Sequence, residues 1–210
     1  IKGTVKLMFQ PAEEILSGAK NMIENGVLQN PSVDGALMIH VMAGLPLKTG
    51  TIIVANGISA PAADYFTINV QGKGCHGSTP QQGVDSITIG AHILLALQEI
   101  NARELGVSDE ATLTVGKMNG GTAGNVIADK IVMEGTLRAY DEDVRRHIKK
   151  RVAEITQGVA NTFRGKGSAN FGNGCPPLKN DGQLSKEIEG YLTDVFGAEM
   201  ILNTEKMGGR

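Results

Sequence analysis

Apolar and polar residues follow different rhythms along the chain, and these rhythms predict its elements. Residues 3–9 and 33–40 are short apolar runs, which is typical of buried strands. The segment 17–26 between them predicts a helix, because Ser17 stands at the N-cap position and Gly26 stands where helices commonly end. Strand, helix and strand in succession form a βαβ unit, so the two strands should run parallel.

The rhythm changes after a hinge of small residues and proline at 59–64. The expected elements beyond it are strand 64–72, helix 84–103, strand 111–118, strand 130–140, a helix from Asp141 to Phe163, and strand 167–173. This β-α-β-β-α-β order is that of the split βαβ, ferredoxin-like arrangement. A strand at 50–57 precedes the hinge, and a helix at 183–197 follows the set.

Both helices of this set carry apolar residues at helical spacing, which predicts the faces that they bury. The face expected for the first helix consists of Val84, Ile87, Ala91, Leu94 and Leu97. The stripe expected for the second helix consists of Val144, Ile148, Val152, Ile155, Val159 and Phe163. Asp141 should cap the start of the second helix.

Composition narrows the class of protein. Hydrophobic residues make up 41% of the 210 residues and the net charge is -2, which favours a folded domain with a core and argues against a nucleic-acid surface. Aromatic side chains are scarce, and no apolar run approaches the ~20 residues of a membrane helix. Cys75 and Cys175 form no disulfide framework, so we expect a reducing, cytoplasmic setting.

Two adjacent carboxylates, Glu13 and Glu14, end the stretch FQPAEE directly after the first apolar run. His40 ends the second run. The carboxyl ends of parallel strands share one edge of a sheet, so we expect these three side chains to be neighbours. Carboxylate and imidazole are good ligands for zinc and similar ions, and a second carboxylate can act as general base.

Both observations have plainer explanations. The acid pair can be a solvated helix start, since acids are favoured at that end of the helix dipole. A lone histidine such as His40 is more often a core or capping residue than a metal ligand.

Six motifs occur in the order typical of one protein family. They are FQPAEE, a following GA, the IH that ends the second apolar run, GKGCHGSTP, GGTAGNVIADK and GTLRAYD. Over nearly its whole length the chain resembles the M20 metallopeptidase family, and within it the amidohydrolase branch of hippurate hydrolase, N-acyl-amino-acid amidohydrolases and auxin-conjugate hydrolases. The resemblance implies an α/β fold, a partial parallel-sheet catalytic domain at 1–60 and 175–210 that is interrupted at 61–174 by a ferredoxin-like lid and dimerisation domain.

The resemblance also assigns roles to residues. Glu13 corresponds to the general base, and Glu14 and His40 correspond to metal ligands. His76 matches a lid histidine that polarises the scissile carbonyl and stabilises the oxyanion, in its own subunit or across a dimer. A donor placed there is worth about 2.7–4 kcal/mol in comparable cases. The plainer explanation for His76 is a turn histidine beside glycines.

Asn125 and Arg138 match positions that contact substrate in the family. Arg138 would pair bidentately with the free carboxylate of the amino-acid half, and its alternative is a surface strand arginine in a salt bridge. Cys75 stands where the family usually has a glycine-like residue, so we interpret it as a packing substitute. The GGTAGN segment lacks the lysine and following helix of a P-loop, so we interpret it as a turn.

Other metal ligands of the family have no counterpart in this sequence. A CGHD-like stretch should precede this region, and a histidine should follow a GGEDF-like turn, which would begin at Gly208 and Gly209. His92 and His147 fall inside predicted lid helices and are poor ligand candidates. We therefore expect a piece of a longer protein that holds metal weakly and hydrolyses nothing measurable by itself.

The activity expected of the longer parent is hydrolysis of the amide bond of N-acyl amino acids, including hippurate-like substrates. It would use two divalent ions per subunit (zinc, manganese, cobalt or nickel), metal-activated water and Glu13 as base. Alternatives are a dipeptidase or aminopeptidase of the same family and a non-catalytic dimerisation fragment. The expected partners are an N-acyl amino acid or small peptide and a second copy bound through the lid, with no nucleic acid and no membrane.

Overall fold

The computed structural model describes residues 2–204, which divide into two compact units. Unit 1 takes the chain up to Ala60 and from Leu178 onward, and unit 2 is Pro61–Pro177. The sequence predicts the first boundary at the same place and the second boundary slightly earlier, after residue 174. The turn predicted at Gly208 lies outside the described residues.

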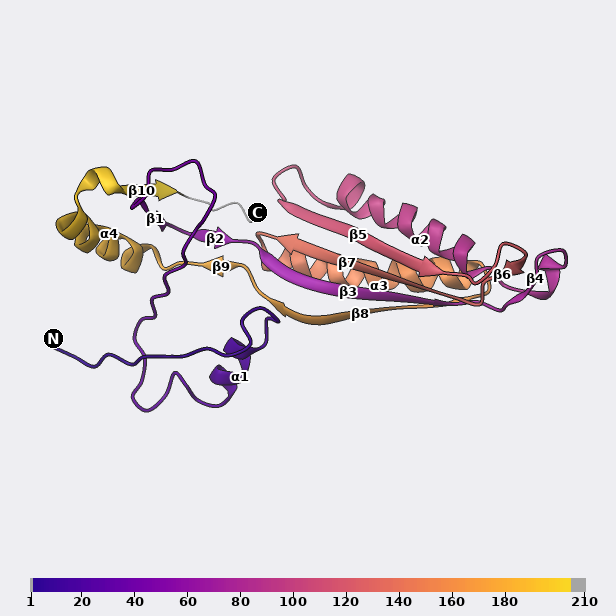
Figure 1. Ribbon diagram of the computed structural model, residues 1–210, viewed down its shortest axis with the longest axis horizontal. Helices are drawn as coiled ribbons and strands as arrows, with labels where there is room; N and C mark the ends of the chain where they lie inside the picture. The colour runs from indigo at the N-terminus through magenta and orange to yellow at the C-terminus, as the bar shows by residue number, and fades with distance from the viewer. Residues whose placement is uncertain (1, 205–210) are drawn as a thin grey trace. The chain divides into compact units, whose positions relative to one another are not determined.

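Unit 2 is built on a four-stranded antiparallel sheet with the strand order β5-β7-β3-β8. The strands are β3 (Ala62–Gln71), β5 (Ala111–Gly120), β7 (Lys130–Ala139) and β8 (Lys166–Cys175). The helices α2 (Ser86–Glu99) and α3 (Glu142–Thr162) connect them in the predicted order β-α-β-β-α-β (Figure 1). A π-helical turn, Ile100–Glu104, continues α2, and a 3₁₀ turn, Pro80–Gln82, precedes it.

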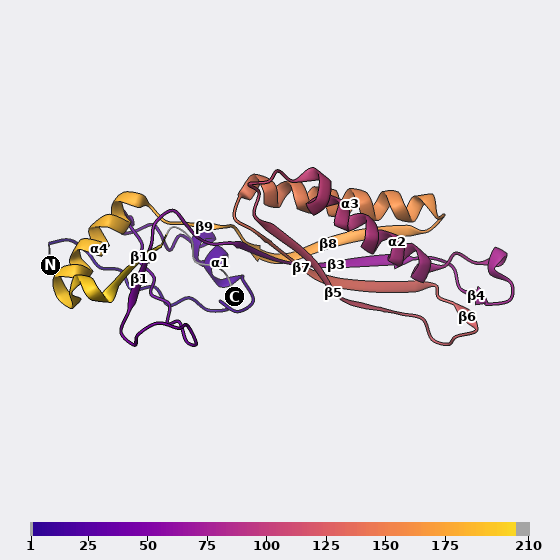
Figure 2. The same ribbon diagram turned by 90° about the horizontal axis from the view of Figure 1, so that it is seen from above.

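The core of unit 2 lies between one face of the sheet and both helices, which cover the same face (Figure 2). β3 alternates as predicted, with Phe66, Ile68 and Val70 buried and Tyr65 exposed. The opposite, open face of the sheet carries mostly polar side chains, such as Thr67 and Asn69 of β3 and Thr136 of β7, and is covered by no helix of unit 2. Figure 2 shows this open face beneath the sheet.

The helix α3 follows its predicted pattern. Ile148 and Val152 are fully buried, and the other members of the stripe pack against the core. The side chain of Asp141 caps the helix, because its Oδ1 accepts hydrogen bonds from the backbone N–H groups of Asp143 (2.8 Å) and Val144 (3.0 Å). Both predictions for this helix are confirmed.

The helix α2 buries a face that agrees only in part with the predicted one, since Leu97 is buried as predicted and Ala91 is exposed. Ile89 is buried, whereas Ile87, expected inside, is 44% exposed. The helix sequence SITIGAHILLALQE is apolar on almost every side, so its spacing does not select one face. Close packing selects the buried face instead: Gly90 faces Ile131 of β7 so closely that a β-carbon there would collide with it.

Unit 1 contains short elements among its described residues. They are α1 (Gly18–Glu24), β1 (Ile52–Ala55), β2 (Ile58–Ala60), β9 (Leu178–Lys179), α4 (Gly182–Phe196), a 3₁₀ turn (Ala198–Met200) and β10 (Ile201–Thr204). β1 pairs in parallel with β10, and β2 pairs antiparallel with β9. The parallel pair therefore joins the two chain segments of unit 1.

The predicted strands at 3–9 and 33–40 are wrong, since neither segment has strand structure. Phe9 and Ile39 are each 85% exposed, and no described strand pairs with either segment. A strand needs a neighbour for its backbone groups, and an apolar run without one stays irregular. The predicted parallel βαβ unit is therefore not formed.

The helix between these segments forms, but its predicted cap does not. The side chain of Ser17 makes no capping hydrogen bond. Gly26 follows the helix with φ of 79°, the left-handed conformation in which glycine ends helices. Among residues 2–204, no helix combines the length and the apolar composition that a bilayer-spanning helix needs.

Candidate functional site

A two-stranded ribbon beyond the end of the sheet brings two predicted site residues together. β4 (Cys75–His76) pairs antiparallel with β6 (Val126–Ile127), with His76 opposite Val126. The backbone N–H of Gly77 donates to the carbonyl oxygen of Asn125 at 2.8 Å. His76 and Asn125 are therefore neighbours on one ribbon, and both are exposed.

The imidazole of His76 is held through one ring nitrogen. The backbone N–H of Ser78 donates to His76 Nδ1 at 3.2 Å, and Ser78 Oγ lies 2.7 Å from the same atom. The carbonyl oxygen of His76 accepts from the N–H of Thr79 (2.9 Å). The turn therefore fixes the ring and leaves Nε2 directed away from these contacts.

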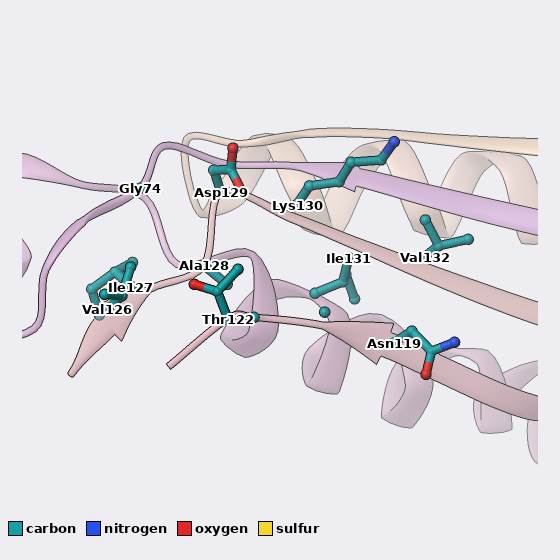
Figure 3. Close-up of a pocket in the computed structure, with 12 residues that line it drawn as sticks. Gly74, Asn119, Thr122, Val126, Ile127, Ala128, Asp129, Lys130, Ile131 and Val132 are labelled. Atoms are coloured by element: carbon teal, nitrogen blue, oxygen red, sulfur yellow. The ribbon is translucent and has the colours of Figure 1, made fainter. Parts of the chain in front are cut away.

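A cavity of about 510 Å³ adjoins this ribbon. Val126 and Ile127 of β6 lie at one end of it, and Asn119 and Val132 lie at the other (Figure 3). A side-chain contact helps to hold its wall, since the carbonyl oxygen of Ala128 accepts from Ser86 Oγ at 2.8 Å. An apolar group beside His76 would find room in this cavity.

Arg138 lies on the open face, at the opposite end of the sheet from the ribbon. It pairs with Ala63 of β3, and its guanidinium lies over the ring of Tyr65, 5.7 Å from the centroid. Its guanidinium donates a hydrogen bond to the carbonyl oxygen of Leu137 at 3.0 Å. The nearby acid on the same strand, Glu134, is paired with Lys117 at 2.7 Å.

No acid among the described residues lies within ion-pair distance of Arg138. This observation disfavours the alternative of a strand arginine in a salt bridge. A half-buried guanidinium with an aromatic ring on one side and no carboxylate partner can accept a carboxylate from a ligand. The sequence analysis did not identify Tyr65 as the packing partner of Arg138. Its position could have indicated it, because Tyr65 is two residues from Ala63, the strand partner of Arg138, and therefore lies on the same face of the sheet.

His76 and Arg138 are far apart within one chain. Arg138 and Lys130 are eight positions apart on β7, which at strand spacing is roughly 26 Å. The β4–β6 ribbon lies at the Lys130 end, since the N–H of Gly72 donates to the carbonyl oxygen of Asp129 at 2.7 Å. No N-acyl amino acid of ordinary size spans that length.

The acid pair of unit 1 lies in an unusual turn. Ala12 and Leu16, which flank Glu13 and Glu14, have φ values of 54° and 55°, a region that residues other than glycine seldom adopt. The N–H of Leu16 donates to the carbonyl oxygen of Glu13 at 2.9 Å. Strained backbone of this kind is often found at functional sites.

The predicted metal ligands do not assemble into a metal site in the described part of the chain. Glu13, Glu14 and His40 are all exposed, and His40 Nδ1 lies 2.8 Å from the carbonyl oxygen of Val41. Residues 2–204 contain no group of three or more His, Cys, Asp or Glu side chains placed to hold an ion. The residues present therefore do not fit a metal by themselves, and their ligand roles stay predictions.

The remaining histidines and the cysteine beside His76 have structural contacts. His92 stacks on Phe163 with centroids 4.6 Å apart, and His147 Nε2 lies 3.0 Å from Glu104 Oε2. Cys75 Sγ donates to the carbonyl oxygen of Thr79 at 3.4 Å. The contact of Cys75 within the turn agrees with its interpretation as a packing residue.

A buried ion cluster at the start of β3 was not identified from the sequence. Asp64 is 0% exposed and accepts hydrogen bonds from Arg145 (2.6 and 2.8 Å) and Lys149 (3.1 Å). Burial raises the pKa of Asp64, but the hydrogen bonds and positive charges of both partners outweigh it and hold the pKa below its ordinary value. The cluster fastens β3 to α3 beside the boundary with unit 1.

Comparison with known proteins identifies unit 2. The family model of the M20 peptidase dimerisation domain matches residues 61–162. N-acetyl-L-cysteine deacetylase of Bacillus subtilis (strain 168) is 38% identical over 92% of this chain and 45% of its own length. IAA-amino acid hydrolase ILR1-like 2 of Arabidopsis thaliana is 37% identical over 100% of this chain and 47% of its own length.

Solved structures agree in fold. A crystal structure from methicillin-resistant Staphylococcus aureus has a TM-score of 0.81 and 31% identity, covering 94% of this chain and 51% of that chain. A dinuclear metal-binding peptidase of the M20 family from Bacillus subtilis has a TM-score of 0.71 and 27% identity, and the match covers 96% of this chain and 49% of that chain. The chain spans about half the length of the curated relatives it matches. Residues 61–162 are an M20 peptidase dimerisation domain, and the chain as a whole is similar to hydrolases of the M20 type.

Proposed function

We propose that this protein takes part in hydrolysing the amide bond of N-acyl amino acids. The observation that carries the proposal is the agreement between the two named relatives, one of which is named for removing an acetyl group from an amino acid and the other for hydrolysing an IAA-amino acid. Both match along more than nine-tenths of this chain.

The described residues support separate roles in that reaction. Arg138, with no acid partner, would bind the free carboxylate of the amino-acid half. His76 would donate from Nε2 to the oxygen of the scissile carbonyl, where negative charge develops. Glu13 would act as general base, taking a proton from water and returning it to the leaving amine.

Metal dependence is proposed from the family and not from the described residues. The Bacillus subtilis structure is described as dinuclear. We assign Glu14 and His40 as two of the ligands for a pair of divalent ions such as zinc, manganese, cobalt or nickel. Catalytic zinc sites use at least three protein ligands, so further ligands are needed beyond these two.

The cavity beside β6 supports an aromatic, hippurate-like acyl group. Val126, Ile127 and Val132 contribute apolar surface to it, and β6 is the strand partner of the segment that bears His76. An acyl group attached to a carbonyl at His76 would extend along this apolar surface, which Asp129 and Lys130 border.

Unit 2, a ferredoxin-like lid, would form the homodimer through the β5 edge of its sheet. The neighbouring helix α2 carries one charged residue, Glu99, and exposes Ile87 (44%) and Leu95 (69%), whereas α3 along β8 is rich in charge. An apolar helix beside an unpaired edge strand suits a second copy of the same chain. Sedimentation of a Leu95→Glu variant tests this, and unchanged association would exclude this face.

A dimer of this kind would resolve the separation between His76 and Arg138. Two β5 strands paired antiparallel about a two-fold axis place the Gly120 end of one copy beside the Ala111 end of the other. The Ala111 end is the Arg138 end, because Thr112 pairs with Arg138. We therefore assign His76 to act across the dimer, on substrate held by the partner copy.

A second candidate function is a dimerisation module without catalysis. The observation that favours it is the lack of an assembled metal site among residues 2–204. A dipeptidase or aminopeptidase of the same family is a further alternative. Assays that compare N-acyl amino acids with free dipeptides distinguish it from an amidohydrolase.

Hydrolysis assays with Glu13→Gln test the proposal. The assay uses the longer parent protein, supplied with zinc, manganese, cobalt or nickel and offered N-acetyl, N-benzoyl and indole-acetyl amino acids beside free dipeptides. Activity on the acylated substrates should fall by roughly 10²–10⁴-fold in Glu13→Gln. Glu24→Gln, a change to an exposed acid of α1, is the matched control and should leave the rate unchanged. Equal rates for Glu13→Gln and the control would exclude Glu13 as the base.

A further inference from the structure

The turn after β4 presents His76 in one defined protonation pattern. Two groups of Ser78 approach a single atom, His76 Nδ1: the backbone N–H at 3.2 Å and the hydroxyl Oγ at 2.7 Å. A neutral imidazole carries one proton, on either Nδ1 or Nε2, and the partner of each nitrogen decides between them.

The backbone N–H of Ser78 determines on which nitrogen the proton lies. A backbone amide can only donate, so Nδ1 must accept from it and cannot carry a proton of its own. The hydroxyl of Ser78 can donate or accept, and it adjusts by donating to the same lone pair. The proton of the neutral ring is therefore on Nε2.

The position of the turn is fixed by contacts that do not involve the imidazole. The N–H and the hydroxyl of Thr79 both donate to the carbonyl oxygen of His76, at 2.9 and 3.2 Å. The N–H of Gly77 donates to the carbonyl oxygen of Asn125. Ser78 thus approaches the ring from a backbone that is already held, and the outward direction of Nε2–H is prearranged.

We propose that Ser78 is a positioning residue, which selects the Nε2–H tautomer of His76 and so makes this side chain a hydrogen-bond donor. The proposal rests on the proposed function only for the use of that donor, which is to stabilise an oxyanion. In the other tautomer Nε2 would carry a lone pair and repel the developing negative charge. Two hydrogen bonds of Ser78 thereby decide whether His76 assists the reaction or opposes it.

Nitrogen NMR of the whole chain, labelled with ¹⁵N in histidine, tests the proposal without any need for hydrolysis. At about pH 8.5, well above the ordinary histidine pKa of ~6.5, each neutral ring shows which nitrogen carries the proton. The chain has four histidines, and a His76→Gln variant identifies the signals of His76. His92 and His147, held by Phe163 and Glu104, serve as internal references for an intact fold.

Three variants give distinguishable outcomes. The original chain should show His76 as the Nε2–H tautomer. Ser78→Ala keeps the backbone N–H and should keep this tautomer dominant, but it loses the hydrogen bond from the hydroxyl and should raise the ratio of the other tautomer about fivefold. Ser78→Thr, which keeps the hydroxyl, should restore the original ratio. Ser168→Ala, a change at an exposed serine of β8, should have no effect.

Two results would overturn the proposal: an Nδ1–H tautomer in the original chain, or a ratio in Ser78→Ala equal to that of the Ser168→Ala control. Where hydrolysis is measurable, Ser78→Ala should lower kcat in proportion to the loss of the Nε2–H population of His76 and leave KM unchanged. A tautomer change without any change in kcat would support the positioning of His76 and count against its proposed role in catalysis.

Discussion

Similar apolar segments are buried in strands in unit 2 but exposed and irregular in unit 1. In unit 2, strands such as β3 bury Phe66, Ile68 and Val70 between a sheet and two helices. In unit 1, the apolar runs around Phe9 and Ile39 are exposed and irregular. Among the described residues, Ala55 is the one hydrophobic side chain of unit 1 that is almost fully buried.

The difference shows that an apolar run is a necessary condition for a strand and not a sufficient one. Each strand of unit 2 has neighbours within Pro61–Pro177, which supply its hydrogen-bond partners and cover its apolar face. Among residues 2–204, the apolar runs of unit 1 have no paired strand, and their apolar side chains stay exposed. A segment that prefers the strand conformation forms a strand only when its apolar face is buried and its backbone groups are paired.

Matched isoleucine truncations in the two units should give the largest difference. Ile68→Ala removes a side chain that is 0% exposed, so it should cost about 3–4 kcal/mol of unfolding free energy. Ile39→Ala removes one that is 85% exposed and should change the stability of unit 2 by less than about 0.5 kcal/mol. Denaturant unfolding followed by circular dichroism measures both. Similar losses would mean that residues around Ile39 are packed after all.

Removing the buried charge of Asp64 should have the next largest effect. Asp64→Asn leaves Arg145 and Lys149 without their buried carboxylate, which should cost about 3 kcal/mol. The folded-state pKa of Asp64 is lowered, so its stabilisation is complete above the unfolded-state pKa of ~3.9 and is lost as pH falls through the folded-state value.

Unfolding measured across acidic pH separates this contribution from others. The original chain should lose stability as the pH falls below about 4, and Asp64→Asn should lose less over the same interval. Glu104, whose pKa is lowered by its hydrogen bond to Arg151, contributes in the same direction and remains in both proteins. Parallel pH curves for the two proteins would contradict the lowered pKa of Asp64.

Matched helix caps should give the smallest effect. Asp141 caps α3 in unit 2, and Asp181 caps α4 in unit 1 with the same pair of backbone N–H contacts. Asp141→Ala should lower the stability of unit 2 by about 1 kcal/mol. Asp181→Ala should leave the unfolding of unit 2 unchanged, because it acts in the other unit. A loss of unit 2 stability in Asp181→Ala would show that the units unfold together.

The sequence predicted α3 well and α2 poorly, and composition explains the contrast. Charged residues occupy the outer face of α3, so its apolar stripe has one interpretation. In α2 apolar residues occur on every face, and the buried one is chosen by Gly90 against Ile131, a contact between residues far apart in the chain. Local pattern identified the helix, and its orientation needed tertiary packing.

The candidate site shows the same limit. His76, Asn125 and Arg138 were chosen from motifs, but their spacing along the chain did not reveal that His76 and Asn125 share a ribbon while Arg138 is at the opposite sheet end. The two-residue strands of that ribbon are too short to give a periodic signal. Ser78 could have been noticed from the sequence, since a serine two positions after a histidine is within reach of its ring.

The chain enters and leaves unit 2 at almost one point. Ala60 is paired with Leu178 on one side of the boundary, and Ala63 is paired with Cys175 on the other. Paired residues of neighbouring strands have Cα atoms only about 4.5–5.5 Å apart. The whole of Pro61–Pro177 could therefore be excised and the gap closed by a tight turn, so a gene could gain, lose or exchange this module without redesigning the host around it.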